Sequence, residues 1–197
     1  MRTFLRLVLF SLVVSLSGCG YNTLQSSDEQ SKASWSEVVN QYQRRADLVP
    51  NLVNTVKGYA AHEQRVLTQV TQARAQVGAV NLTPEALNDP AALAKFQAAQ
   101  SQLSSALSRL LVVSENYPQL KADAGFRDLQ AQLEGTENRV AQSRREYNEF
   151  TTAFNRALRT FPRSLISGIF GFEKRALYVA DPASQTAPKV DLTPSGS

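Results

Sequence analysis

The side chains best suited to nucleophilic, acid–base or metal chemistry are scarce in this sequence, which holds one cysteine, Cys19, and one histidine, His62. A disulfide needs a second cysteine, and structural zinc sites need four cysteine or histidine ligands. The stretch AHEQRV begins like the helical zinc motif, but no second histidine stands four residues after His62. We therefore expect no bound metal, no cofactor and a solvated His62.

Catalysis by a hydroxyl or thiol nucleophile would depend on His62 as the base, and the surrounding GYAAHE shows no sign of such a site. Glu134 and Glu137 lie one helical turn apart, a spacing that is common among solvated carboxylates. The stretch GIFGF lacks the lysine and the Ser/Thr of a phosphate-binding loop. These patterns predict that the protein is not an enzyme.

Two groups of polar residues remain as candidates for a binding site. The first flanks Pro50 and consists of Arg44, Arg45, Asp47, Asn51 and Asn54. The second lies further along the chain and consists of Glu137, Asn138, Arg139, Arg144 and Asn148.

These groups have two interpretations. In the first, Arg44 pairs with Asp47, and the other residues satisfy backbone groups freed by Pro50 or fix the register of packed helices. In the second, the two groups face each other and form a polar groove that binds a ligand. We expect the first and keep the second as the alternative.

Helices must position these residues, because apolar side chains recur at steps of three and four along three long segments. In the first segment, a capping box at Ser27 and Gln30 predicts a start near Asp28, and Gly78 predicts the end. The apolar stripe keeps its phase across Pro50, which indicates a kinked helix rather than a break. The stripe consists of Trp35, Val38, Tyr42, Ala46, Val49, Val53, Val56, Ala60, Leu67, Val70 and Val77.

The second helix is predicted to follow the start signals Thr83-Pro84 and Asp89-Pro90. The third shows a heptad seam typical of a coiled coil. That seam consists of Phe126, Leu129, Leu133, Thr136, Val140, Ser143, Tyr147, Phe150, Phe154 and Ala157. No core stretch alternates with period two, so we predict an all-α fold. It is an antiparallel up-and-down bundle of three long helices, and the kinked first helix makes it like a four-helix bundle.

The N-terminal residues have the three zones of a secretory signal peptide: Arg2 and Arg6, an apolar run over 7–16, and small residues before Cys19. The run is shorter than the roughly 20 residues of a membrane-spanning helix. LSGC, which ends at Cys19, resembles the lipobox of bacterial lipoproteins. The resemblance implies cleavage before Cys19 and lipid attachment to it, palmitate included. A stray cysteine in an uncleaved signal is the alternative.

The sequence divides into four parts. We expect a signal peptide over 1–18, a lipidated tether over 19–27, a helical bundle domain over 28–180 and a disordered tail over 181–197. The apolar stretch SLISGIFGF, which begins at Ser164, is expected to close one end of the bundle and to bury Phe170 and Phe172. Contact of this stretch with a membrane or a partner is the alternative.

The charge of the chain does not favour nucleic acid as a partner. The formal net charge is +4, and removal of Arg2 and Arg6 with the signal peptide would leave 4 − 2 = +2. The longest basic runs are the pairs Arg44-Arg45 and Arg144-Arg145, whereas binding of DNA or RNA needs a clustered basic face.

Three long stretches of the sequence resemble the LemA family of bacterial envelope proteins. They are NQYQRRADLVPNLVNTVKGYAAHE (40–63), YPQLKADAGFRDLQAQLEGTENRVAQSRREYNEF (117–150) and FNRALRTFPRSLISGIFGF (154–172). The resemblance implies a helical bundle outside the cytoplasmic membrane, with no established activity, cofactor or catalytic residue. Many members keep an N-terminal transmembrane helix, whereas this apolar segment ends in a lipobox.

From these observations we expect a non-enzymatic, membrane-anchored envelope lipoprotein that serves as an adaptor or scaffold. A ligand-binding or sensory module that uses the polar groove is the alternative. The expected partners are the membrane, through lipid at Cys19, and envelope proteins that the sequence does not identify. The domain is expected to face the periplasm, and Gly20 in place of an aspartate favours the outer membrane if the source is Gram-negative.

Overall fold

The structure is a computed structural model that describes residues 2–80 and 82–179, with side chains from residue 20 onward. Its long elements are the helices α1 (Arg2–Tyr59), α2 (Gln64–Ala79), α3 (Pro90–Ser114) and α5 (Ala124–Ala157). The short ones are η1 (Pro84–Asn88), α4 (Pro118–Ala122) and α6 (Arg163–Phe170). The described residues include no strand.

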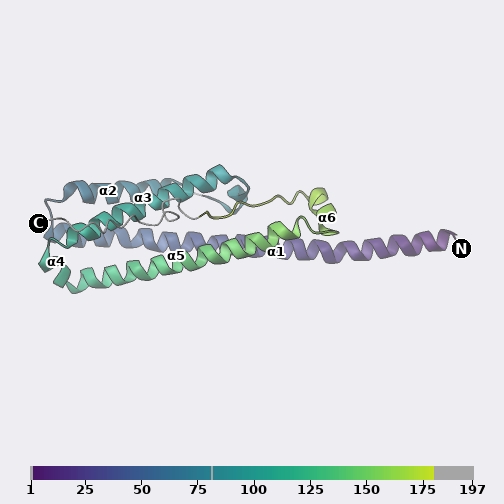
Figure 1. Ribbon diagram of the computed structural model, residues 1–197, viewed down its shortest axis with the longest axis horizontal. Coiled ribbons are helices and arrows are strands. Elements are labelled where there is room, and N and C mark those ends of the chain that lie inside the picture. Colours follow the sequence, from purple (N-terminus) through teal and green to yellow (C-terminus); the bar gives the residue numbers. More distant parts are fainter. Residues whose placement is uncertain (1, 81, 180–197) are drawn as a thin grey trace, which may run out of the picture.

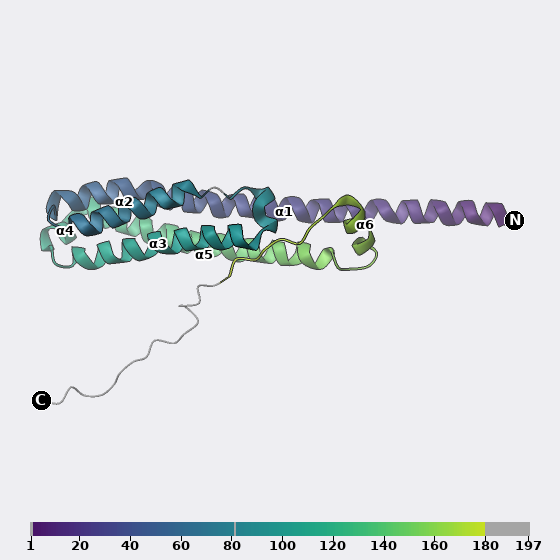
Figure 2. The ribbon, with the colours of Figure 1, turned by 90° about the horizontal axis from the view of Figure 1, so that it is seen from above.

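Successive long helices run in opposite directions and form one elongated bundle (Figures 1 and 2). The α1–α5 pair makes the most extensive contact and the α2–α3 pair the next. The arrangement confirms the predicted all-α, antiparallel, up-and-down bundle. At one end α1 and α5 extend beyond the other two helices, and α6 packs there against α1 (Figure 1).

Pro50 lies inside α1 without ending it, as the phase of the apolar stripe predicted. Proline has no N–H to donate, so the carbonyl four residues earlier, that of Ala46, loses its helical partner. Arg74 of α2 replaces this partner, since its Nε donates to the Ala46 oxygen at 3.0 Å. The capping group was expected among the polar residues beside Pro50, but it comes from the neighbouring helix.

The prediction that the first helix continues to Gly78 is wrong, because the chain turns at residues 60–63. Ala60 N donates to Val56 O at 2.8 Å and Glu63 N to Ala60 O at 3.0 Å, which closes the turn. The apolar stripe did not reveal this break, since Ala60 and Leu67 are seven residues apart, a spacing of two helical turns. The first predicted helix thus becomes α1 and α2.

The predicted start of the first helix near Asp28 is also wrong, because α1 begins at Arg2. Residues 20–27, expected as a polar tether, are helical, and Leu24 among them is fully buried. Leu24 packs with Phe154, Leu158 and Ile166, so this part of α1 belongs to the packed bundle. The expected tail over 181–197 lies outside the described residues.

Aromatic rings occupy the middle of the bundle. Trp35 lies edge-on to Phe96 and to Tyr147, with ring centroids 5.3 and 5.2 Å apart, and its Nε1 donates to the carbonyl of Leu82 at 3.0 Å. The three rings come from three different helices, and Trp35 and Tyr147 belong to the predicted stripe and the predicted seam. Such contacts anchor α1 to α3 and α5 at one level of the core.

The seam of α5 is buried largely as predicted, including the polar entries Thr136 and Ser143. Phe150 is an exception and is exposed, because Thr151 takes the inward position instead. The Thr151 hydroxyl lies 2.8 Å from that of Ser31 in α1, so the two satisfy each other inside the α1–α5 contact.

The predicted burial of Phe170 is wrong, whereas Phe172 is half-buried. In the short helix α6, Ile166 and Ser167 face the bundle. The Phe170 ring contacts the ring of Tyr21 at the edge of the bundle. Most of its surface is exposed to solvent.

After α6 the chain returns along the bundle as an extended segment, residues 172–179, which we call the C-terminal strap (Figure 2). Two asparagines of α5 bind its backbone. Asn155 donates to Arg175 O and accepts from Arg175 N, both at 2.9 Å, and Asn148 makes the same pair with Tyr178, both at 2.8 Å. Ala176 N donates to the carbonyl of Leu87 at 2.9 Å.

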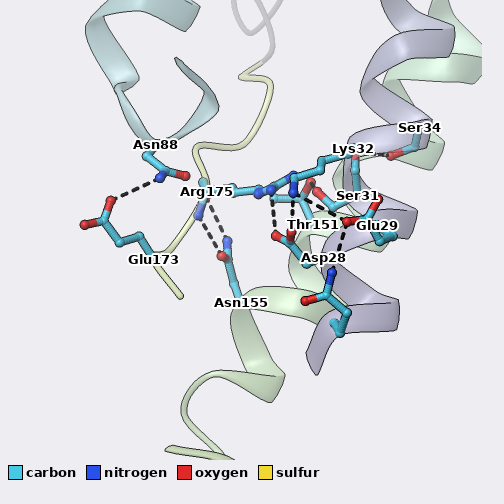
Figure 3. A network of polar contacts seen from close by, with 11 residues as sticks. Asp28, Glu29, Ser31, Lys32, Ser34, Asn88, Thr151, Asn155, Glu173 and Arg175 are labelled. Atoms are coloured by element: carbon cyan, nitrogen blue, oxygen red, sulfur yellow. Dashed lines mark hydrogen bonds and ion pairs between the residues drawn. The ribbon is translucent and has the colours of Figure 1, made fainter. Parts of the chain in front are cut away.

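A buried ion pair also holds the strap (Figure 3). Arg175 Nη2 lies 2.6 Å from Asp28 Oδ1, with both side chains almost wholly excluded from solvent. Lys32 approaches the other carboxylate oxygen at 2.7 Å from a more exposed position. Removal of one member of a buried pair leaves an uncompensated charge, which costs more free energy than the intact pair contributes.

We expect Asp28→Ala to lower the free energy of unfolding by about 3–5 kcal/mol, because the Arg175 guanidinium would remain buried without an anion. Lys32→Ala is the matched control, and its cost should stay below about 1 kcal/mol, since that pair is partly solvated. The double variant Asp28→Ala/Arg175→Met should regain most of the loss. Urea denaturation followed by circular dichroism measures all three, and equal losses for Asp28→Ala and Lys32→Ala would contradict the assignment.

Candidate polar site between α1, α3 and α5

The centre of the polar site is Arg45, whose residue surface is only 1% exposed. It lies on α1, one position before Ala46 of the buried stripe, and it points toward α3 and α5. Its Nη1 donates to Ser104 Oγ at 2.8 Å and to Glu137 Oε1 at 2.5 Å. Its Nη2 donates to Gln100 Oε1 at 2.6 Å and to the Gln100 carbonyl at 3.3 Å.

The guanidinium of Arg45 is therefore hydrogen-bonded from two helices, and Glu137 supplies the opposite charge. Gln100 and Ser104 lie one turn apart on α3, and Glu137 is on α5. The Glu137 side chain is 44% exposed, so the Arg45 end of the ion pair is buried and the Glu137 end is accessible to solvent. Arg45 Nε has no hydrogen-bond partner among the described residues.

An open pocket of about 540 Å³ adjoins this ion pair. Its walls come from α1, α3, α5 and the end of the strap. The lining residues are Tyr42, Arg45, Ala94, Gln97, Ala98, Gln100, Ser101, Ser104, Glu137, Val140, Arg144, Tyr178 and Val179. The volume is that of a site for a small molecule, and the lining mixes charged and amide groups with methyl groups.

Two tyrosines form the inner wall of the pocket. The hydroxyls of Tyr42 and Tyr178 lie 2.6 Å apart. The guanidinium of Arg144 stacks on the Tyr178 ring at 4.0 Å, and that of Arg45 lies 5.0 Å from the Tyr42 ring centre. Both contacts are cation–π interactions, which favour a charged guanidinium beside a partly buried ring.

Burial raises the pKa of the Tyr42 phenol well above its usual value, and the neighbouring Tyr178 raises it further. Burial also raises the pKa of Tyr178, although the hydrogen bond between the Tyr42 and Tyr178 hydroxyls opposes this change. Burial raises the pKa of Tyr147 in the same core. All three phenols are therefore neutral hydrogen-bonding groups near neutral pH.

The structure brings together only part of the two predicted groups. Arg45 and Glu137 meet, and Arg144 lines the same pocket. Asn148 binds the strap. The others are exposed away from this pocket: Arg44, Asp47, Asn51, Asn54, Asn138 and Arg139.

The expected Arg44–Asp47 ion pair is wrong, since Asp47 instead accepts a hydrogen bond from Gln43 Nε2 at 2.9 Å. The sequence reasoning also missed Tyr42, Gln100, Ser104 and Tyr178. Tyr42 was placed in the apolar stripe, and Gln100 follows two alanines of α3 and precedes a serine, with no charged neighbour to mark it. The arrangement can bind a polar ligand.

Four further observations concern the lone histidine, metal ligands, membrane spans and the lone cysteine. His62 is exposed in the turn between α1 and α2. No group of three or more potential metal ligands was found in the part of the chain that the structure describes. Within the residues whose side chains the structure describes, no helix is both long and apolar enough to cross a membrane. Cys19 lies within α1, but its side chain is outside the described residues.

Comparison with known proteins gives one family match and several relatives. A model of the LemA family matches residues 34–192. Magnetosome proteins MamQ 2 and MamQ 1 of Paramagnetospirillum magneticum are each 25% identical to this chain, and magnetosome protein MamQ of Magnetospirillum gryphiswaldense is 24% identical. Each alignment covers 84% of this chain and 67% of the relative.

The Arg45–Glu137 pair predicts an asymmetric response to mutation. Glu137→Ala leaves a buried cation without its anion, and we expect a loss of about 2–3 kcal/mol in the free energy of unfolding. Arg45→Met leaves a carboxylate that water can reach, and we expect a loss of about 1 kcal/mol. Chemical denaturation of both variants tests this order, and Asn138→Ala on the exposed side of α5 is the control. A greater loss for Arg45→Met would overturn this account.

The raised phenol pKa values predict a loss of stability in alkali. The neutral phenols contribute fully to the free energy of unfolding below the unfolded-state pKa of about 10. This contribution is lost as the pH rises through their higher folded-state pKa values. Denaturation midpoints should thus change little between about pH 7 and 9 and fall above about pH 10. The variant Tyr42→Phe/Tyr178→Phe should show a shallower fall, and Tyr147 accounts for part of the remainder. An unchanged slope in this variant would contradict the prediction.

Proposed function

The chain belongs to the LemA family, and from this premise we propose that it is a non-enzymatic, membrane-anchored lipoprotein of the bacterial envelope. In this proposal the bundle is a periplasm-facing adaptor or scaffold for other envelope proteins. The observation that carries the anchor is the order of basic residues, apolar run, small residues and Cys19 in the first nineteen positions.

Lipid attached at Cys19 would supply the membrane anchor. Each buried methylene contributes roughly 0.8 kcal/mol, and two or more acyl chains make attachment stable. The family match begins at residue 34, so the anchor is argued from the sequence of this chain alone. Gly20 after Cys19, in place of aspartate, favours the outer membrane if the source is Gram-negative.

The adaptor role is supported by what the fold offers to other molecules. The bundle presents long helix faces of exposed polar residues. The named relatives are magnetosome proteins, so their names refer to a cell structure and not to a reaction. An adaptor needs an exposed surface and a fixed position, and a rigid anchored bundle supplies both.

The pocket favours a second candidate, a ligand-binding or sensory module. Its volume of about 540 Å³ and the partly exposed guanidinium of Arg144 suit a small polar ligand with an anionic group. The two candidate functions differ in which molecules should be crosslinked to the protein in cells or purify together with it. Crosslinked envelope proteins support the adaptor, whereas a co-purified small molecule that protects Arg144 from chemical modification supports the ligand-binding module.

Cys19→Ser tests the anchor in cells that process lipoproteins. We expect the variant to lose labelling by radioactive palmitate and to move from the membrane fraction to the soluble fraction, because the thioether cannot form. Ser17→Ala in the same segment is the control and should change neither result. Unchanged labelling and unchanged fractionation of Cys19→Ser would overturn the anchor.

A further inference from the structure

Four of the large apolar residues that are exposed among the described residues lie within ten positions of the sequence, in α6 and just before it. Phe161, Leu165, Ile169 and Phe170 are 77, 62, 79 and 60% exposed, and we call these four residues the α6 patch. Other large exposed apolar residues, such as Val112 on α3, are scattered along the bundle. Single exposed apolar residues are ordinary, but a cluster of this kind indicates an interaction surface.

The helix α6 lies where α1 enters the packed bundle (Figures 1 and 2). A Cβ on Gly20 would come within 2.7 Å of Ile166 Cδ1, so the α1 backbone and α6 approach closely there. The rings of Tyr21 and Phe170 lie 4.8 Å apart. Gly20 and Tyr21 directly follow Cys19, so a lipid on Cys19 would emerge beside α6.

Three arginines stand close to the α6 patch in the sequence. Arg156 and Arg159 are exposed at the end of α5, and Arg163 is half-buried at the start of α6. None of these three arginines takes part in an ion pair within the described part of the chain. Residues 161–170 contain no acidic side chain. Arginines beside an apolar surface complement anionic lipid headgroups, whose phosphates they bind in two-pronged geometry.

We infer that the α6 patch docks on the surface of a phospholipid bilayer that contains anionic headgroups. The four apolar side chains enter the boundary between headgroups and acyl chains, and the three arginines meet the phosphates. This inference rests on the proposed function, because the anchor at Cys19 brings α6 to the membrane. A partner protein on the same surface is the competing outcome, and the position beside the anchor favours lipid.

Fluorescence quenching by brominated lipids tests the inference on the full chain. Phe170→Trp places an indole in the α6 patch, and Val112→Trp places one on an exposed apolar position of α3 near the opposite end of the bundle. Trp35, the native indole, is buried and gives the same background in both variants. Each lipidated variant is purified from membranes and reconstituted in vesicles of phosphatidylcholine and phosphatidylglycerol, with bromines near the headgroup end of the acyl chains.

We expect the indole introduced by Phe170→Trp to lose most of its fluorescence in these vesicles and the one introduced by Val112→Trp to lose almost none. Ile169→Glu added to Phe170→Trp should weaken the quenching, while circular dichroism and flotation with the vesicles stay unchanged, because residue 169 is exposed and the anchor remains. Protein that floats with the vesicles but shows equal, weak quenching at both positions overturns the α6 inference and leaves the anchor standing. Protein that does not float overturns the anchor and the α6 inference together.

Discussion

An extended segment can lie against helices only if its backbone N–H and C=O groups find partners, and this constraint shapes both functional surfaces of the bundle. Asn148 and Asn155 on α5 meet it for the C-terminal strap. The two asparagines are seven residues apart on α5, and the strap residues that they bind are three apart. Seven helical residues and three extended residues span similar lengths, so one face of α5 can bind the strap at both points. Because the strap is held, α6 is fixed beside α1, and Tyr178 closes one wall of the pocket.

The sequence predicted the helices wherever the buried side chains of a helix form one continuous apolar stripe. The stripe across Pro50 and the seam of α5 depend on local periodicity, and both were found in the structure. The turn at Ala60–Glu63 was not predictable, because a seven-residue step has the same phase in one continuous helix and in two helices packed on one core. Phe150 and Thr151 exchanged roles, since hydrophobicity alone cannot show that Ser31 offers Thr151 a buried hydroxyl partner.

The polar site shows that the charge pattern near Pro50 does not predict which arginine is buried. That depends on how the helices pack. Arg45 and Arg44 are neighbours in the sequence with the same chemistry, yet one is 1% exposed and the other is solvated. The difference comes from the rotation of α1 relative to α3, where Gln100 and Ser104 accept hydrogen bonds from the inward guanidinium. Likewise the partner of the carbonyl freed by Pro50 is Arg74. Its role depends on how α2 packs, which no local pattern encodes.

The two surfaces are far enough apart for separate tasks. From Gly20 to Arg45 the helix α1 advances 25 residues, which corresponds to about 38 Å at about 1.5 Å per residue. If α6 rests on a bilayer, the pocket then stands well outside the headgroup region whenever α1 is steeply inclined to the membrane. An acyl anchor alone would leave that inclination free, whereas a second contact through α6 would restrict it. The polar site would thereby be held at a constant height, where soluble partners or ligands of the envelope can reach it and lipid cannot.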